Sequence, residues 1–309
     1  MGRIIPRIVR TIRYRFLLIA GVFPYLVGVS YAYHKTAIFH MVIFVIGLCG
    51  ISLALLAVEY INEYFDSRIG TDHIFSLERR PAPSYYKFVG FGALLFAFFI
   101  AVLLTIERGY TIMLLSLIGG FAIFFYLGPP FKLSHRGFGE ITIALSYGVF
   151  MTMGGFYLQT QRIDFSVIGA SIPASLCILA LTLVNEIPDY YQDRLAGKRN
   201  IVVRLGRQKT ARLFGMALIL LYTALIFELI YGILPPLSWS ILLTLPVAFR
   251  SFTTAIKYYD QPLQFTLAIR GVIAIYVISM AILSLGYLFT PINTQPMDVL
   301  GLEVQKQKI

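Results

Sequence analysis

The chain has 309 residues, of which 58% are hydrophobic and only 13% are charged. A mean hydropathy of +0.77 excludes an ordinary soluble domain, because a single core cannot bury that much apolar surface. The formal net charge of +11 fits attraction to anionic lipid headgroups or to an anionic substrate. Nucleic acid is not an expected partner, because no soluble basic domain is present.

Continuous apolar runs divide the chain into membrane-spanning helices. Their continuity argues against a β-barrel, whose strands would be short and alternating. The basic N-terminus precedes a run without a cleavage pattern, so a retained helix is favoured over a signal peptide. We predict an all-α bundle, one domain over residues 1–309, with about nine spans. The expected spans are about 16–33, 38–61, 88–106, 110–128, 139–158, 166–187, 212–232, 237–259 and 270–289.

Lysine and arginine residues are distributed unevenly between the two sides of this bundle. Of the 26 such residues, one side holds only Lys35, Arg108, Arg162, Lys306 and Lys308. The positive-inside rule then places the N-terminus in the cytoplasm and the C-terminus outside. We therefore expect a multi-pass protein of the cell membrane, in contact with its lipids.

Two apolar runs end in the same N-E-x-x-D pattern. The second run leads into NEYFDSRIGTD at 62–72, and the sixth into NEIPDYYQD at 185–193. Acids at a membrane edge are costly unless they face a cavity or a partner, so two such clusters on the cytoplasmic side indicate function. In a continuing helix, Asn185, Asp189 and Asp193 would share one face. Gly70 predicts a helix break before Asp72.

The chemistry of these side chains indicates a magnesium–diphosphate site. Oxygen ligands suit Mg²⁺, which binds through one or two carboxylates plus substrate phosphates. A zinc site would require thiol or imidazole ligands, and neither the cysteines nor the histidines have that spacing. Arg and Lys in the following connectors would stabilise charge on a diphosphate leaving group. These are Arg68, Arg79, Arg80, Lys132, Arg136, Arg194, Lys198, Arg199 and Arg204.

The group attached to the diphosphate should be apolar, because the site adjoins aromatic-rich membrane helices. An isoprenyl chain fits, and aromatic faces would stabilise its allylic cation. Tyr126 and Tyr147 are candidates, although a single aromatic residue more often serves packing or interfacial anchoring. An ion-coupled transporter stays open as a different class, since transporters also carry acids within helical bundles. Acids at one membrane face fit a site open to the cytoplasm better.

These motifs resemble those of the UbiA superfamily of intramembrane prenyltransferases. The resemblance rests on Asn62 to Asp66 with Asp72, on Asn185 to Asp189 with Asp193, and on YLGPPFK at 126–132. Glu63 stands where the family usually has Asp. The resemblance covers nearly the whole chain and implies nine helices, with cytoplasmic loops capping the active site.

The resemblance implies Mg²⁺-dependent transfer of a polyprenyl group, such as geranylgeranyl, from its diphosphate to an acceptor. It assigns catalytic roles to Asp66, Asp189, Lys132 and Tyr126. Diphosphate contacts would come from Arg68, Lys132 and Arg136. The metal ligands would be Asn62, Asp66, Asp72, Asn185, Asp189 and Asp193.

The expected acceptor is an aromatic ring. The stretch DYYQDRLAGKRNIVVRLG and the spacing of the first motif look most like the branch that prenylates 1,4-dihydroxy-2-naphthoate in menaquinone biosynthesis. The alternatives within the superfamily are prenylation of 4-hydroxybenzoate and alkylation of geranylgeranylglyceryl phosphate.

Overall fold

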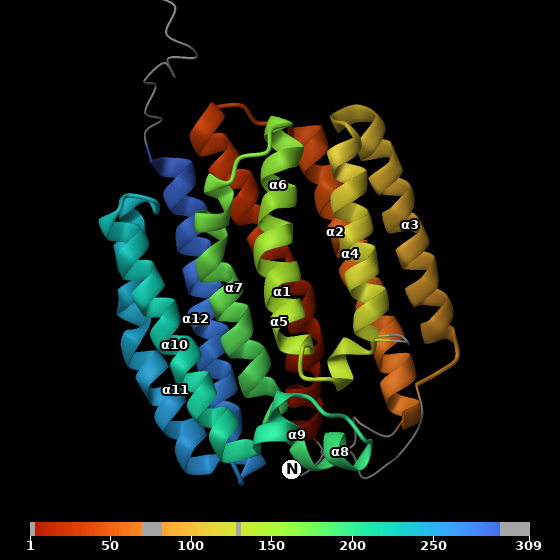
Figure 1. The fold of residues 1–309 in the computed structure, drawn as a ribbon, viewed down its shortest axis with the longest axis vertical. Coiled ribbons are helices and arrows are strands. Elements are labelled where there is room, and N and C mark those ends of the chain that lie inside the picture. The colour runs from red at the N-terminus through yellow and green to blue at the C-terminus, as the bar shows by residue number, and fades with distance from the viewer. Residues whose placement is uncertain (1–3, 70–81, 128–130, 291–309) are drawn as a thin grey trace, which may run out of the picture.

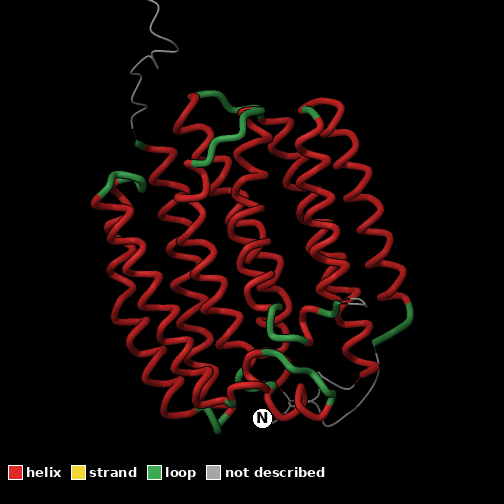
Figure 2. Tube along the Cα trace, in the orientation of Figure 1, coloured by secondary structure: helices red, strands yellow, loops and turns green. Residues whose placement is uncertain are grey.

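The computed structural model describes residues 4–69, 82–127 and 131–290, without the side chains of residues 4–19, Asp66, Ile69 and Leu127. These residues form helices and loops, and no strand occurs in the ranges just given (Figure 2). The long helices run side by side as an upright bundle (Figure 1). The predicted all-α class is confirmed.

Long helices and two composite rods build the bundle, and short helices join them. The long helices are α1 (Ile4–Thr36), α2 (Met41–Ile69), α3 (Tyr85–Arg108), α4 (Tyr110–Leu127), α7 (Ser166–Glu186), α10 (Arg207–Ile230) and α12 (Pro262–Phe289). One composite rod runs through α5 (Gly139–Ile143), the π-helix η2 (Ala144–Phe150) and α6 (Met151–Thr160), and the other through the 3₁₀-helix η3 (Pro236–Thr244) and α11 (Leu245–Tyr258). The short helices are η1 (Leu133–His135), α8 (Tyr190–Leu195) and α9 (Ile201–Leu205).

Seven helices in the described part of the chain are long and apolar enough to cross a membrane. They are Met41–Phe65, Tyr85–Arg108, Gly139–Thr160, Ser166–Glu186, Arg207–Ile230, Pro236–Tyr258 and Pro262–Phe289. The other two expected spans coincide with α1 and with the shorter apolar helix Tyr110–Tyr126. The number of nine crossings therefore stays a prediction.

The main core lies among α1, α7, α10 and α12. Ala174, Leu221 and Tyr276, from α7, α10 and α12, are fully buried there. The phenol of Tyr276 donates a hydrogen bond to the backbone carbonyl of Ala20 on α1. Many of the buried side chains on α7 are small, which allows neighbouring membrane helices to approach closely.

The first helix is also fixed against α6 by glycines. A Cβ atom at Gly28 would overlap the backbone carbonyl of Thr152, and one at Gly155 would lie 2.5 Å from the carbonyl oxygen of Tyr25. The two backbones therefore touch, as is common where small residues meet between membrane helices. This contact joins α1 to the composite rod that lines the cavity described below.

Both acid-bearing segments lie at one end of the bundle. The end of α2, the end of α7 and helices α8 and α9 all lie near the start of α1, whereas α12 ends at the opposite end (Figure 1). The sequence repeat therefore marks one face of the molecule, as the topology predicted. This end is called the acidic end below.

Candidate active site

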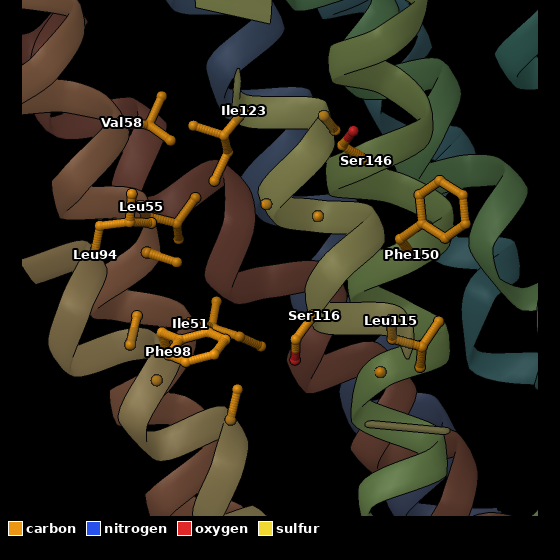
Figure 3. Close-up of a pocket in the computed structure, with 18 of the residues that line it drawn as sticks. Ile51, Leu55, Val58, Leu94, Phe98, Leu115, Ser116, Ile123, Ser146 and Phe150 are labelled. Carbon is orange, nitrogen blue, oxygen red and sulfur yellow. The ribbon is translucent and has the colours of Figure 1, made fainter. Parts of the chain in front are cut away.

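A large cavity of about 820 Å³ lies between α2, α3, α4 and the rod 139–160. Most of its lining is aliphatic or aromatic: Leu55 and Val58 come from α2, and Leu94 and Phe98 from α3 (Figure 3). Phe150 lines it from the composite rod (Figure 3). Such a chamber suits a long apolar ligand.

The polar residues of the lining gather toward the acidic end. Helices α2 and α4 end there, and the rod 139–160 begins there (Figure 1). The polar lining residues near these helix ends are Glu59, Asn62, Tyr126, Thr142, Ser146 and Tyr147. Ser116 is the exception, because it lies nearer the start of α4, away from the acidic end. The cavity therefore extends from Asn62 of the first motif into an apolar interior.

The first motif lies on the last turns of α2. Asn62 lines the cavity, and Glu63 is buried. The side chain of Asp66 and all of Asp72, Arg79 and Arg80 lie outside the described residues. The expected metal roles of Asp66 and Asp72 therefore stay predictions.

Arg68 lies beside this motif but is directed onto its own helix. Its guanidinium stands 3.5 Å from the ring centre of Tyr64 and donates to the carbonyl oxygens of Tyr64 at 2.8 Å and Ala82 at 3.4 Å. The residue is exposed. Its predicted diphosphate contact would require the side chain to leave this position.

The second motif spans a break between two helices. The predicted span 166–187 matches α7, which ends at Glu186, and α8 begins at Tyr190, so no single helix continues through Asp193. Pro188 accounts for the break, since proline lacks the backbone N–H and its ring clashes with the preceding turn. Asp189 and Asp193 are 7% and 5% exposed, so the turn holds both carboxylates inside the protein.

Asp193 is held by two side chains. One carboxylate oxygen lies 3.3 Å from the Lys198 ammonium, and the other accepts a hydrogen bond of 2.7 Å from the amide of Asn200. Burial raises the pKa of Asp193 to about 6, although the Lys198 charge opposes the rise and Asp189 adds to it. A bound cation would favour the carboxylate form again.

The loop that carries Lys198 and Asn200 is itself tied to other elements. The Asn200 side chain caps α9 by accepting the Val203 N–H at 3.1 Å. The Ile201 N–H donates to Oε1 of Glu140 at 2.7 Å, and the Glu140 side chain is only 1% exposed. Unpaired buried acceptors are costly, so these contacts fix the loop against α5.

The connector after α4 lies beside this loop. The Arg199 N–H donates to the His135 carbonyl at 2.8 Å, and the Ser134 hydroxyl donates to the Tyr126 carbonyl at 2.8 Å. Lys132 and Arg136 flank η1 and are exposed, and the side chain of Tyr126 lines the cavity. The diphosphate contacts expected of Lys132 and Arg136, and the catalytic role expected of Tyr126, stay predictions.

The positive charge at this connector comes from its lysine and arginine residues. Burial, together with the nearby charges of Lys198 and Lys132, lowers the pKa of His135 to about 4. The imidazole is therefore neutral at pH 7. Lys132 and Arg136 are left to attract an anionic ligand.

The donor chemistry fits Mg²⁺. Asn62, Asn185, Asp189 and Asp193 offer oxygen atoms, which Mg²⁺ prefers. Within the described residues, which do not include the side chains of Asp66 and Asp72, no three His, Cys, Asp or Glu side chains form a metal-binding group. Sequence reasoning did not predict the roles of Glu140 and Asn200, because neither belongs to an N-E-x-x-D motif.

Comparisons with known proteins identify the family. Residues 21–271 match the UbiA prenyltransferase family. A 2-carboxy-1,4-naphthoquinone phytyltransferase from Synechocystis sp. is 25% identical over 254 residues, covering 79% of this chain and 81% of that protein. A 1,4-dihydroxy-2-naphthoate octaprenyltransferase from Bacillus subtilis is 21% identical over 297 residues, 94% of each chain.

Solved structures share the fold. A UbiA homolog from Aeropyrum pernix K1 has a TM-score of 0.65 at 15% identity, covering 87% of this chain and 98% of that chain. A UbiA homolog from Archaeoglobus fulgidus bound to GPP and Mg²⁺ has a TM-score of 0.60 at 13% identity, covering 90% and 98%. At these identities the likeness establishes the architecture of the bundle.

Proposed function

The chain belongs to the UbiA prenyltransferase family, and from that premise we propose that it prenylates 1,4-dihydroxy-2-naphthoate with the help of Mg²⁺. As a member of that family with several apolar helices, it is an integral membrane prenyltransferase. This assignment favours an enzyme over an ion-coupled transporter. One observation carries the proposal: two oxygen-rich motifs share the end of the bundle at which an apolar cavity opens to polar residues.

The donor would be a polyprenyl diphosphate such as geranylgeranyl diphosphate. The cavity lining extends along α2 from Gly47 to Asn62, which is about 22 Å at 1.5 Å per helical residue. A chain of several isoprene units would lie along this length, with its diphosphate at the acidic end. The charged head would then meet polar groups, and the tail would stay out of water.

The metal would be held by the motif oxygens. Asn62, Asn185, Asp189 and Asp193, together with Asp66 and Asp72, are the proposed ligands. Bound Mg²⁺ would neutralise the diphosphate as its bond to the prenyl carbon breaks.

The positively charged residues would assist from the connectors. Lys132 and Arg136 would bind diphosphate oxygens, and Arg68 would join them after leaving Tyr64. Guanidinium and ammonium groups are suited to this role because they form charge-assisted hydrogen bonds with phosphate. The ring of Tyr126 would stabilise the allylic cation. Asp189 would hold the metal and the diphosphate in position beside that cation.

The naphthoate acceptor is supported by relatives and by sequence. The Synechocystis and Bacillus proteins carry naphthoquinone or naphthoate in their names, which accords with menaquinone biosynthesis. The alternative acceptors are 4-hydroxybenzoate and geranylgeranylglyceryl phosphate. The bias of Lys and Arg toward the acidic end supports an active site and N-terminus in the cytoplasm, with the C-terminus outside.

A transfer assay tests the proposal. Purified protein would be incubated with Mg²⁺, labelled geranylgeranyl diphosphate and, separately, each of the three acceptors. We expect label in the naphthoate product, and its loss in Asp66→Ala and Asp189→Ala. Asp164→Asn is the matched control, because this carboxylate lies before α7 at the other end and accepts the Ser166 N–H.

Two outcomes would contradict the proposal. Label that entered only 4-hydroxybenzoate or geranylgeranylglyceryl phosphate would reassign the acceptor. No diphosphate release with any acceptor, from protein shown to be folded, would contradict the donor chemistry itself.

A further inference from the structure

Glu59 is the one carboxylate among the described residues that line the cavity. It lies on α2 one turn before Asn62, so the two side chains project from the same side of the helix. An ionisable side chain among membrane helices is costly and marks a functional site with a partner. The two motifs do not use Glu59, which leaves its role open.

Hydroxyl-bearing residues from α4, α5 and η2 line the same cavity as Glu59. The phenol of Tyr147 is close enough to interact electrostatically with the Glu59 carboxylate. Tyr147 and Ser146 belong to the π-helix η2, and such irregular turns are frequent at functional sites. Together, Glu59, Tyr126, Thr142, Ser146 and Tyr147 form what we call the polar collar of the cavity.

The polar collar lies where the two substrates would meet. Asn62 follows it toward the acidic end, and Leu55 and Ile51 precede it toward the apolar interior. Figure 3 shows Ser146 on the opposite side of the cavity from Val58 and Leu55. With the diphosphate at Asn62 and the tail beyond Leu55, the reactive prenyl carbon would lie level with Glu59.

We infer that Glu59 binds the acceptor by accepting a hydrogen bond from a ring hydroxyl. This inference rests on the proposed function and names the group that orients its acceptor. The acceptor class is an aromatic ring whose hydroxyl lies away from its carboxylate, because a second carboxylate beside Glu59 would be repelled. In 1,4-dihydroxy-2-naphthoate this is the 4-hydroxyl, and the 2-carboxylate would then point toward Lys132 and Arg136.

The hydrogen bond would also assist the chemistry. In the transfer, the donor C1–O bond breaks and its electron pair leaves with the diphosphate. A ring carbon supplies the pair for the new C–C bond, and the ring then loses a proton or, at a carboxylated carbon, CO₂. A hydroxyl that donates to a carboxylate makes the ring more electron-rich, which favours attack. Glu59 need not take a proton.

A comparison of two acceptors tests this contact. The assay would compare 1,4-dihydroxy-2-naphthoate with 1-hydroxy-2-naphthoate, which lacks the 4-hydroxyl, in unmodified protein, Glu59→Gln and Glu59→Ala. The different intrinsic reactivity of the two rings is the same in all three proteins, so it cancels when their kcat/KM ratios are compared. Glu107→Gln is the matched control, since Glu107 is an exposed glutamate on α3.

We expect the preference for the dihydroxy acceptor to fall by roughly tenfold or more in Glu59→Ala, as for loss of a hydrogen bond to a charged group. The preference of Glu59→Gln should lie between those of Glu59→Ala and the unmodified protein, because its amide oxygen still accepts a hydrogen bond. The KM for the prenyl diphosphate should stay unchanged in both variants, which a general loss of structure would not produce. Glu107→Gln should match the unmodified protein.

The possible failures are distinguishable. If the unmodified protein transfers the prenyl group but both Glu59 variants keep its acceptor preference, this inference is wrong and the proposed function stands. If the unmodified protein transfers to no hydroxylated aromatic acceptor, the proposed function is wrong and the inference falls with it.

Discussion

The end of α2 and the turn between α7 and α8 carry the same N-E-x-x-D spacing but are built differently. In the first motif Phe65 precedes the aspartate and the helix continues to Ile69. In the second motif Pro188 occupies the matching position and ends the helix. The same spacing therefore produces a helical face in one place and a turn in the other.

The surroundings of the two motifs differ as well. Asp193 is held by Lys198 and Asn200, in a loop tied to Glu140. Arg207 anchors α8 from another side by donating to Tyr191 at 2.7 Å. These contacts show how a protein can hold buried carboxylates in place through hydrogen bonds before any ligand binds.

At the end of α2, one described contact is exposed and one is buried. Arg68 stacks on Tyr64, and the Ser67 hydroxyl accepts the N–H of Ala82 at 3.0 Å. We therefore expect substitutions around the second motif to have larger effects than substitutions of Arg68.

The largest effect should follow loss of the Asp193 carboxylate. Asp193→Ala should lower kcat/KM for the prenyl diphosphate by roughly 100- to 1000-fold, as for other groups that stabilise transition-state charge. Steady-state kinetics at saturating Mg²⁺ would measure it, with Asp164→Asn as the control. A loss of less than tenfold would remove Asp193 from the proposed metal ligands.

A somewhat smaller effect should follow removal of the proline that distinguishes the second motif from the first. Pro188→Ala lifts a penalty of about 3 kcal/mol against helix, so α7 can extend and displace Asp193. Because misplacement by about 1 Å can cost up to 100-fold in rate, we expect roughly 10- to 100-fold lower kcat. Phe65→Ala is the control at the matching position. Unchanged kcat would mean that the turn is set by its contacts rather than by proline.

Substitutions of Asn200 can separate its two roles, the cap of α9 and the hydrogen bond to Asp193. Asn200→Asp keeps an acceptor for the cap of α9 but loses the donor to Asp193 and adds a negative charge. We expect Asn200→Asp to lower thermal stability, because a second carboxylate beside the buried Asp193 is repelled, and to change several-fold the Mg²⁺ concentration needed for half-maximal activity. Asn200→Ala should instead lose about 1 kcal/mol of unfolding free energy through the missing cap. An Asn200→Ala variant as stable as the unmodified protein would show that the cap contributes nothing.

The smallest effect is expected at Arg68, beside the first motif. Arg68→Gln removes an exposed cation–aromatic contact worth about 0.5–1 kcal/mol. Since Arg68 must leave this contact to reach the diphosphate, its net contribution to binding should be small, and we expect a roughly two- to fivefold rise in the KM for the prenyl diphosphate, as for an exposed ion pair, measured in the same transfer assay. A loss as large as that of Asp193→Ala would reverse the comparison, and would mean that Arg68 contributes as much as the second motif to diphosphate binding.

Hydropathy located the helices better than it located their ends. The expected span 139–158 corresponds to the composite rod 139–160. The expected spans 212–232 and 270–289 begin later than α10 at Arg207 and α12 at Pro262. Charged and polar residues at these starts terminate the apolar pattern, whereas backbone hydrogen bonding continues the helix beyond the apolar segment.

The motif residues were accessible from sequence because their spacing repeats. The contacts of Glu140 and Asn200 were not, since they depend on α5, α8 and α9 meeting in space. The turn at Pro188 was available in the sequence, because proline rarely continues a helix interior. Glu59 stood one turn from Asn62, but its place in the cavity lining required the packing of α2, α4 and the composite rod.

Three glycines in the cavity lining leave space that a side chain could fill. Gly119 and Gly120 on α4, and Gly154 on α6, line the cavity, and a Cβ atom at any of them would meet nothing within 4 Å. Small side chains can therefore arise there without disturbing helix packing. During evolution, the prenyl length that the enzyme prefers can then change independently of the residues that carry out its chemistry.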